Sequence, residues 1–283
     1  MRNYIELTKP RITTLILICA AVGFVFGTAG SIRIATLVHT LLGTALMASG
    51  TAALNQWYEA AADSKMRRTW IRPIPTGRIP RNRALCFGLT LSVAGFADLW
   101  LGTNRLAALL GLFTLLSYLL IYTPMKQRSP VCTTLGAIPG AMPPLIGFAA
   151  ASGTPTREAW VLFLILFVWQ FPHFYSIAWL YRDDYALAGI RMLPVVEPDG
   201  ESTARRIVSA TLLLLPVTLL PRLLGMAGAA YAMVAIAATL GLLFAGVLFD
   251  RQKTAAGARR VLLATVLYLP IVLLVLVVDR RAT

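Results

Sequence analysis

Long apolar runs alternate along the chain with short segments rich in Arg, Pro and Gly. The runs that carry no charge, or almost none, are 12–32, 34–58, 84–104, 106–125, 129–156, 159–181, 207–221, 223–249 and 261–278. A helix needs about 20 mostly apolar residues to cross a bilayer. The run 207–221 is shorter, but arginines at both ends can reach the interface with their long side chains. The pattern predicts nine membrane-spanning helices, and residues 1–283 then form a single all-α transmembrane domain.

Composition and the distribution of cations agree with a polytopic membrane protein. Of the 283 residues, 58% are hydrophobic and 13% are charged, whereas a soluble domain has about 25% charged residues. With the N-terminus in the cytoplasm, 20 of the 26 Lys and Arg fall on the cytoplasmic side. This bias predicts a cytoplasmic N-terminus and a C-terminus outside. The net charge of +14 therefore reflects topology, and no nucleic-acid-binding motif accompanies it.

Two longer polar segments, 59–83 and 182–206, lie on the predicted cytoplasmic side and hold seven of the twelve Asp and Glu. At the start of the first, Asn55, Glu59 and Asp63 follow one another at intervals of four. On a helix this spacing keeps them on one face, about 6 Å apart along the axis. Amide and carboxylate oxygens suit Mg²⁺, which is often shared with substrate phosphates. The alternative is a solvated helix end.

Cations and a second acidic pair strengthen the metal hypothesis. The cations that follow the first acidic residues are Lys65, Arg67, Arg68 and Arg72. Asp183 and Asp184 stand side by side at the inner end of another predicted span. Cations beside a carboxylate-held metal describe a diphosphate site. The two acidic clusters are consistent with two metal ions that bind one diphosphate.

The run LGAIPGAMPPLIGF, at 135–148, has three prolines at membrane depth. Non-helical backbone is tolerated there only inside the protein or beside a cavity. We therefore expect either a kinked packing helix or the wall of a central cavity, around which the nine helices would be arranged.

These segments resemble a known family. NQWYEAAADSKMRRT, which begins at Asn55, resembles the N-x-x-x-D-x-x-x-D motif of the UbiA-type intramembrane prenyltransferases. Further segments resemble their protoheme IX farnesyltransferase (heme O synthase) branch: LTKPRITTL, RPIPTGRI, YTPMKQRSP, GAIPGAMPPLIGFAA, WQFPHF and DDYALAGIRMLPVV. The resemblance covers about residues 3–200 in motif-bearing detail, and the last three spans match in hydrophobicity and number. Glu59 stands where the family pattern usually has Asp, and the second motif is DD-Y where the wider superfamily has D-x-x-x-D.

The resemblance implies a reaction and its partners. The farnesyl group of farnesyl diphosphate would be transferred to a vinyl group of protoheme IX (heme b) with addition of water, which gives heme O. Mg²⁺ would bridge the diphosphate. The enzyme would lie in the bacterial cytoplasmic (inner) membrane with its site loops on the cytoplasmic side, and would hand its product to a heme A synthase or to terminal oxidase assembly.

The resemblance also implies roles for individual residues. Metal binding falls to Asn55, Glu59, Asp63, Asp183 and Asp184. Diphosphate or substrate contact falls to Arg67, Arg68, Arg72, Lys126 and Tyr122, and contact with heme propionates to Lys9 and Arg11. The residues expected in catalysis are Asp63, Asp183 and His173. If Tyr58, Tyr122, Tyr175 and Tyr185 line the cavity, they would stabilise the carbocation by cation–π contact; an interfacial aromatic belt is the alternative.

His173, one of two histidines, lies about 12 Å inside the predicted sixth span. An ionisable group at such depth is a functional candidate. Axial contact with heme iron, a base that positions the capturing water, and a hydrogen-bonded packing histidine all remain open. Pro172 is expected to open the local backbone, and His39 is expected to be structural.

Two other functions compete with heme farnesylation. A UbiA-type prenyltransferase acting on a quinone precursor or another aromatic acceptor would share the first motif, but the segments between Pro139 and Val196 favour the heme branch. A secondary transporter would hold its charges near the midplane, whereas these carboxylates cluster at inner helix ends.

Overall fold

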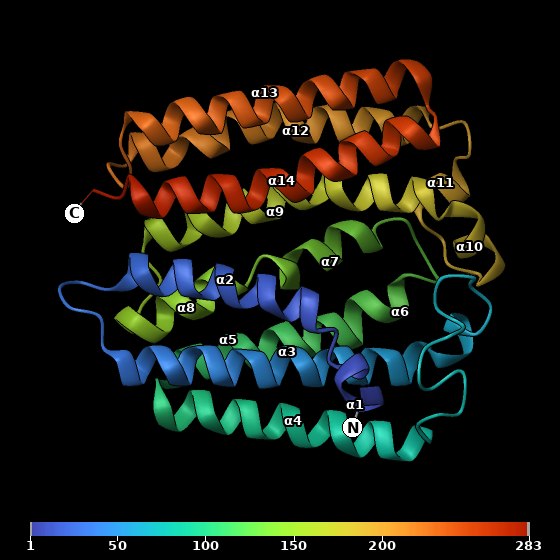
Figure 1. Ribbon diagram of the computed structural model, residues 1–283, viewed down its shortest axis with the longest axis horizontal. Helices are drawn as coiled ribbons and strands as arrows, with labels where there is room; N and C mark the ends of the chain where they lie inside the picture. Colours follow the sequence, from blue (N-terminus) through green and yellow to red (C-terminus); the bar gives the residue numbers. More distant parts are fainter. Residues whose placement is uncertain (1, 282–283) are drawn as a thin grey trace.

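A computed structural model describes residues 2–281 (Figure 1). Within that range, all nine predicted spans are helical. The unbroken spans are α2 (Pro10–Gly27), α3 (Ile34–Asp63), α4 (Arg81–Gly102), α9 (Arg157–Leu180), α12 (Glu201–Leu223), α13 (Ala229–Gln252) and α14 (Ala255–Val278). The fourth span is composed of α5 (Arg105–Leu116), η1 (Ser117–Tyr122) and α6 (Thr123–Met125), and the fifth of α7 (Cys132–Gly140) and α8 (Pro143–Ser152). The short run 207–221 belongs to a longer helix than its apolar length suggests, because α12 begins at Glu201.

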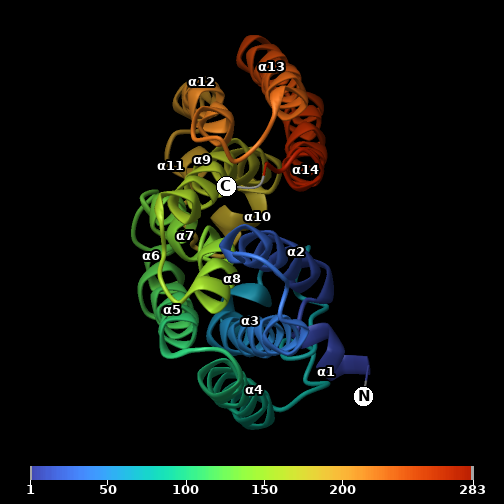
Figure 2. The same ribbon diagram turned by 90° about the vertical axis from the view of Figure 1, so that its left-hand side faces the viewer.

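The spans form two groups that lie side by side (Figure 2). In one group α2 packs on α8, and α3 packs on α4; in the other, α9, α12, α13 and α14 pack on their neighbours. The segment between α3 and α4 lies at the same end of the bundle as the short helices α10 (Arg182–Leu187) and α11 (Leu193–Val196), and the C-terminus lies at the opposite end (Figure 1). Both acid-rich segments therefore share one end of the molecule, as the sequence pattern predicts.

The proline-rich fifth span breaks between α7 and α8, at Ala141 and Met142. Its second half lies directly against α2, because a side chain at Gly23 would collide with the carbonyl group of Pro144, and one at Gly147 with that of Ala20. Small residues that let two backbones approach closely are a common means of helix association in membranes. The close contact fixes the broken span against α2.

The fourth span changes from α-helix to π-helix over Ser117–Tyr122. Such segments are rare and occur frequently at functional sites. Tyr118 and Tyr122 lie in this segment with their ring centroids 4.9 Å apart in an edge-to-face arrangement. The hydrophobicity of the run predicts a span but not this local winding.

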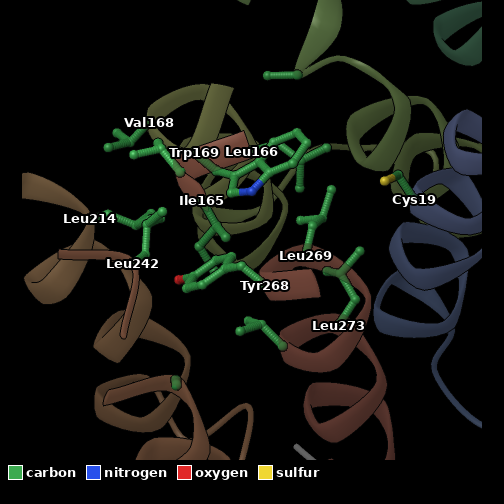
Figure 3. Close-up of a cluster of buried hydrophobic side chains, with 14 of the residues drawn as sticks. Cys19, Ile165, Leu166, Val168, Trp169, Leu214, Leu242, Tyr268, Leu269 and Leu273 are labelled. Atoms are coloured by element: carbon green, nitrogen blue, oxygen red, sulfur yellow. The ribbon is translucent and has the colours of Figure 1, made fainter. Parts of the chain in front are cut away.

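The second helix group has an apolar core in which the hydroxyl group of Tyr268 is paired. Ile165, Trp169, Leu242 and Tyr268 are buried in it (Figure 3). The hydroxyl group of Tyr268 donates to Thr218 Oγ1 at 2.9 Å. Such pairing removes the cost of burying a phenol.

Helix α9 continues without a break through Pro172, so the expected opening of the backbone there is wrong. A proline removes one intrahelical hydrogen bond, and the packing of α9 against α12 and α14 holds the helix together across it. His39 of α3 lies 2.8 Å from Asp98 of α4. This contact ties two neighbouring helices, as expected for a structural histidine.

Candidate active site

A cavity of about 380 Å³ lies among α2, α3, the π segment, the broken span and α9. Gly136, Pro139 and Pro143 form part of its wall, so the proline-rich run is a cavity wall rather than only a kinked packing helix. Ligand pockets in proteins are typically apolar clefts of about 300–1,000 Å³ with a few polar groups. The cavity has the size and character of a site for an apolar substrate.

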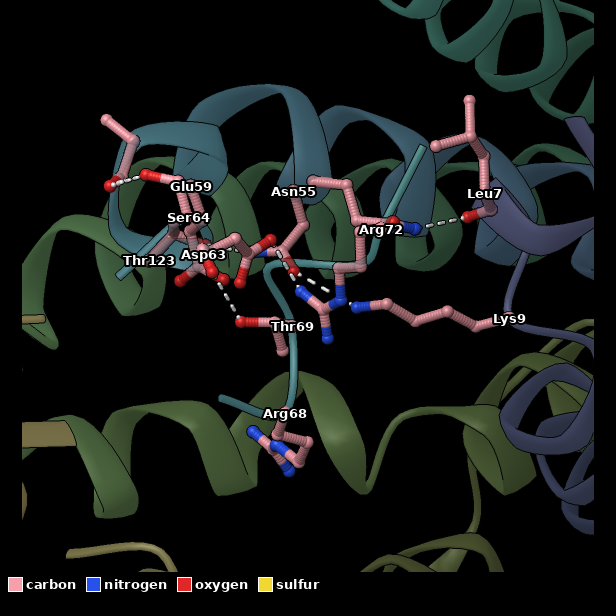
Figure 4. Close-up of polar contacts among 12 residues, drawn as sticks. Leu7, Lys9, Asn55, Glu59, Asp63, Ser64, Arg68, Thr69, Arg72 and Thr123 are labelled. Atoms are coloured by element: carbon pink, nitrogen blue, oxygen red, sulfur yellow. Dashed lines mark hydrogen bonds and ion pairs between the residues drawn. The ribbon is translucent and has the colours of Figure 1, made fainter. Parts of the chain in front are cut away.

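Asn55, Glu59 and Asp63 lie together on the last turns of α3, and Asn55 and Asp63 are both 1% exposed. We call these three residues the acceptor row. Each of them contacts a basic side chain from another segment: Lys9 Nζ lies 3.2 Å from Asn55 Oδ1, Lys126 Nζ 2.7 Å from Glu59 Oε1, and Arg72 Nη1 2.6 Å from Asp63 Oδ2. Figure 4 shows Lys9 and Arg72 beside the row. The four-residue spacing correctly predicts that the three side chains share one face of the helix. The fold then brings a basic side chain to each of them.

The pKa values of the two lysines are shifted in opposite directions. Burial alone would lower the pKa of Lys126, but the Glu59 carboxylate holds that pKa well above its usual value. Burial and then the charge of Arg72 lower the pKa of Lys9 to about 7. The site therefore holds two fixed cations and a third amine, Lys9, that is costly to charge until an anion joins it.

The two carboxylate oxygens of Asp63 differ in their contacts. Its Oδ2 accepts from Arg72, whereas no hydrogen-bond partner among the described residues contacts its buried Oδ1. A buried carboxylate oxygen left unpaired is costly, and a divalent cation would satisfy it. No group of three Asp, Glu, His or Cys in the described chain could enclose a metal alone. The acceptor row thus fits Mg²⁺, which usually takes one or two carboxylates and completes its shell with water and substrate phosphate.

The second acidic pair is arranged differently. The Asp183 side chain is 93% exposed and lies 3.9 Å from Arg182. Asp184 Oδ2 accepts from the backbone N–H of Arg68 at 3.2 Å. The structure does not bring Asp183 to the acceptor row, and metal binding by this pair stays a prediction.

Arg68 joins the two polar segments. Its guanidinium lies over the ring of Tyr181, 4.6 Å from the centroid, and Nη2 donates to the hydroxyl of Tyr185 at 3.4 Å. In Figure 4 its side chain points away from the acceptor row. The residue therefore connects the segment after α3 to α10 rather than adding a cation to the row.

Other predicted substrate residues divide between the cavity and the surface. Tyr122 lines the cavity, as expected. The cavity-lining expectation is wrong for Tyr58, which is exposed, for Tyr175, which is buried in the helix core, and for Tyr185, which contacts Arg68. Arg11 and Arg67 are exposed, and their substrate contacts stay predictions.

The sequence patterns did not single out Tyr118 and Thr123. Tyr118 lines the cavity, and Thr123 Oγ1 accepts from Asn55 Nδ2 at 3.3 Å. Tyr118, Tyr122 and Lys126 are spaced by four residues, like the acceptor row. That spacing was the signal from which Tyr118 could have been found.

His173 lines the cavity from α9. Its Nδ1 lies 2.9 Å from Thr265 Oγ1 on α14, and its ring stacks on Trp169 with 5.0 Å between centroids. The structure therefore places it at the cavity surface, where both functional options remain open, and gives it a hydrogen-bond partner.

Comparison with known proteins gives the family. Residues 16–273 match the UbiA prenyltransferase family. The chain is 57% identical over 289 residues to a protoheme IX farnesyltransferase of Solibacter usitatus, covering 99% of both chains. It is 48% identical to one of Koribacter versatilis, covering 99% of this chain and 94% of the relative.

Solved structures show the same fold at lower sequence identity. A digeranylgeranylglyceryl phosphate synthase has a TM-score of 0.82 at 18% identity over 98% of this chain and 97% of its own. A UbiA homologue from Archaeoglobus fulgidus, bound to GPP and Mg²⁺, has a TM-score of 0.70 at 19% identity over 97% and 99%. The chain belongs to the UbiA prenyltransferase family, in the group of the protoheme IX farnesyltransferases.

Proposed function

We propose that this chain transfers the farnesyl group of farnesyl diphosphate to a vinyl group of heme b, with addition of water, to give heme O and diphosphate. The observation that carries the proposal is a buried oxygen of Asp63 with no partner among the described residues, in a row of acceptors that Lys9, Arg72 and Lys126 contact. Lys9 belongs both to this cluster and to the wall of the apolar cavity. A diphosphate held at the cluster would therefore have its hydrocarbon tail beside the cavity.

The charged groups act on the leaving group. Arg72 and Lys126 would contact diphosphate oxygens, and Lys9 would gain a proton as the anion binds. Asn55, Glu59 and Asp63 would hold Mg²⁺, which when bound supplies Lewis-acid neutralisation of the leaving charge. The allylic C–O bond then breaks, and its electron pair leaves with the diphosphate.

The cavity protects and directs the resulting farnesyl cation. Apolar walls exclude the water that would capture this cation too early. Tyr118 and Tyr122 line the cavity, and aromatic rings there would stabilise the cation by cation–π contact. The vinyl π electrons of heme b form the new C–C bond, water adds to the carbon next to the macrocycle, and a proton is released. Tyr118 joins Tyr122 in this role although the sequence did not identify it.

The location and the fate of the product belong to the same proposal. The chain is a multi-pass membrane protein, and we infer that it lies in the bacterial cytoplasmic membrane with the acceptor row facing the cytoplasm. Farnesyl diphosphate is water-soluble at its charged end, so entry from the side that holds both acid-rich segments fits its chemistry. The product would pass to a heme A synthase or to terminal oxidase assembly.

Purified protein with heme b, farnesyl diphosphate and Mg²⁺ tests the proposal. Mass spectrometry should show heme that has gained a farnesyl group and one hydroxyl group. Omission of Mg²⁺ should abolish the gain. Transfer to a quinone precursor with no change in heme would instead indicate an aromatic-acceptor enzyme, and uptake into vesicles without chemical change would indicate a transporter.

A further inference from the structure

His173 is held by a hydrogen bond that selects one form of its imidazole. Thr265 Oγ1 donates its single proton to the carbonyl oxygen of Leu262 at 2.7 Å. If that proton pointed to His173 instead, Thr265 Oγ1 and the carbonyl oxygen of Leu262 would lie 2.7 Å apart with no hydrogen between them. The hydroxyl must therefore accept from His173, so that Nδ1 carries the proton and Nε2 carries the lone pair.

The position of Thr265 is itself fixed from the α9 side. Trp169 Nε1 donates to the backbone carbonyl of Thr265 at 2.9 Å, and the Trp169 ring stacks on His173 at an interplanar angle of 19°. One face of the imidazole is thus covered by the indole. His173 lines the cavity, and no described residue forms a hydrogen bond with its Nε2, so that atom is available to a ligand.

We propose that His173 Nε2 is an axial ligand of the heme iron in the acceptor substrate, and that Thr265 is the positioning residue that orients it. This inference rests on the proposed function, because it takes heme b to be the acceptor. Metal-ligating histidines almost always donate their other ring N–H to a fixed acceptor, which sets tautomer and ring orientation. A histidine whose N–H is occupied and whose lone pair faces a ligand cavity is in the form that binds heme iron.

Iron ligation also gives a reason for the contact between two helices that are far apart in the chain. His173 lies on α9 and Thr265 on α14, 92 residues apart in the chain, and Leu269 of α14 lines the same cavity. An Fe–N bond would fix the plane of the macrocycle relative to α9. It would thereby fix which vinyl group reaches the farnesyl cation.

The test is heme binding without farnesyl diphosphate. Detergent-purified full-length protein is titrated with ferrous heme b, and the iron–histidine stretching band is followed by resonance Raman spectroscopy. We expect the band in the unchanged protein and its loss in His173→Ala, with return of an imidazole-ligated spectrum when free imidazole is added. His39→Ala is the control, because His39 is paired with Asp98 and lies outside the cavity wall. The same spectrum in His173→Ala as in the unchanged protein would overturn the assignment.

Thr265 provides the second variant. Thr265→Val keeps the shape of the side chain but leaves Nδ1–H without an acceptor, so heme affinity should fall about 10–100-fold, and Thr265→Ser should restore it. Thr211→Val is the matched control, because Thr211 also donates to its own helix but has no histidine partner. Equal losses of affinity in the two valine variants would overturn the positioning role.

Iron dependence separates this inference from the proposed function. Protoporphyrin IX, which lacks iron, should bind the unchanged protein more weakly than heme b does. His173→Ala should bind protoporphyrin IX and heme b with equal affinity. If the protein forms farnesylated heme but the iron–histidine band is absent, the ligand assignment fails and the transfer stands. If the band is present but no farnesylated heme forms, the transfer fails and the ligand assignment stands.

Discussion

The two acidic clusters lie at the same end of the molecule but are prepared for an ion in different ways. In the acceptor row, Asp63 is 1% exposed and each residue already contacts a basic side chain. In the second pair, Asp183 is 93% exposed and Asp184 accepts from a backbone N–H of the neighbouring segment. Buried charges must be paired, whereas exposed ones are solvated at little cost. The acceptor row is therefore a preorganised site. Asp183 and Asp184 would be brought into a fixed arrangement only when an ion binds to them.

Asp63→Asn is the strongest test of the preorganised site. The change keeps the shape of the side chain and removes the charge that would hold Mg²⁺, so kcat for farnesyl transfer should fall about 10²–10³-fold. Asp98→Asn is the control, because Asp98 is also a membrane-helix aspartate with one paired oxygen and one buried oxygen without a partner among the described residues. Equal losses of kcat in the two variants would mean that the unpaired Asp63 oxygen is a consequence of burial and not a sign of ion binding.

Lys126→Met tests what the pairing contributes to the fold. The Lys126–Glu59 pair is 15% and 11% exposed, and removal of one partner leaves a buried charge at a cost of about 3–5 kcal/mol. Thermal unfolding in detergent should occur at a clearly lower temperature. Lys253→Met is the matched control: its pair with Glu201 has the same 2.7 Å distance, but Glu201 is 60% exposed. If both variants unfold at the same temperature, the acceptor row is not held by its cations.

Asp183→Asn tests whether the exposed pair serves a metal at all. Among the described residues the carboxylate has one ion-pair partner, Arg182 at 3.9 Å, so the unfolding temperature should not change. If Asp183 is a metal ligand, the Mg²⁺ concentration at half-maximal rate should rise roughly tenfold, because ligand charge sets affinity for hard cations. Asp199→Asn, in the same polar segment, serves as the control. An unchanged Mg²⁺ requirement in Asp183→Asn would restrict the metal site to the acceptor row.

The sequence predicted features that depend on local spacing and missed those that depend on contacts between distant segments. Nine apolar runs predicted nine spans, and the four-residue interval placed Asn55, Glu59 and Asp63 on one face. The π-helical winding that accompanies Tyr118 in the cavity wall, and the hydrogen bond between His173 and Thr265, have no local signature. The orientation in the membrane was predicted from cation counts and stays a prediction.

Glu59→Asp gives the smallest and sharpest contrast within the row. The motif that this row resembles usually has Asp at this position, and the longer Glu59 side chain reaches Lys126 at 2.7 Å. Shortening it by one methylene keeps the charge but weakens that contact, so kcat/KM should fall only about 2–10-fold, the effect of one hydrogen bond. Glu59→Gln, which keeps the length and removes the charge, should cost more. The opposite order would show that Glu59 acts through its reach to Lys126 and not through its charge toward Mg²⁺, and would leave Asn55 and Asp63 as the ligands of the row.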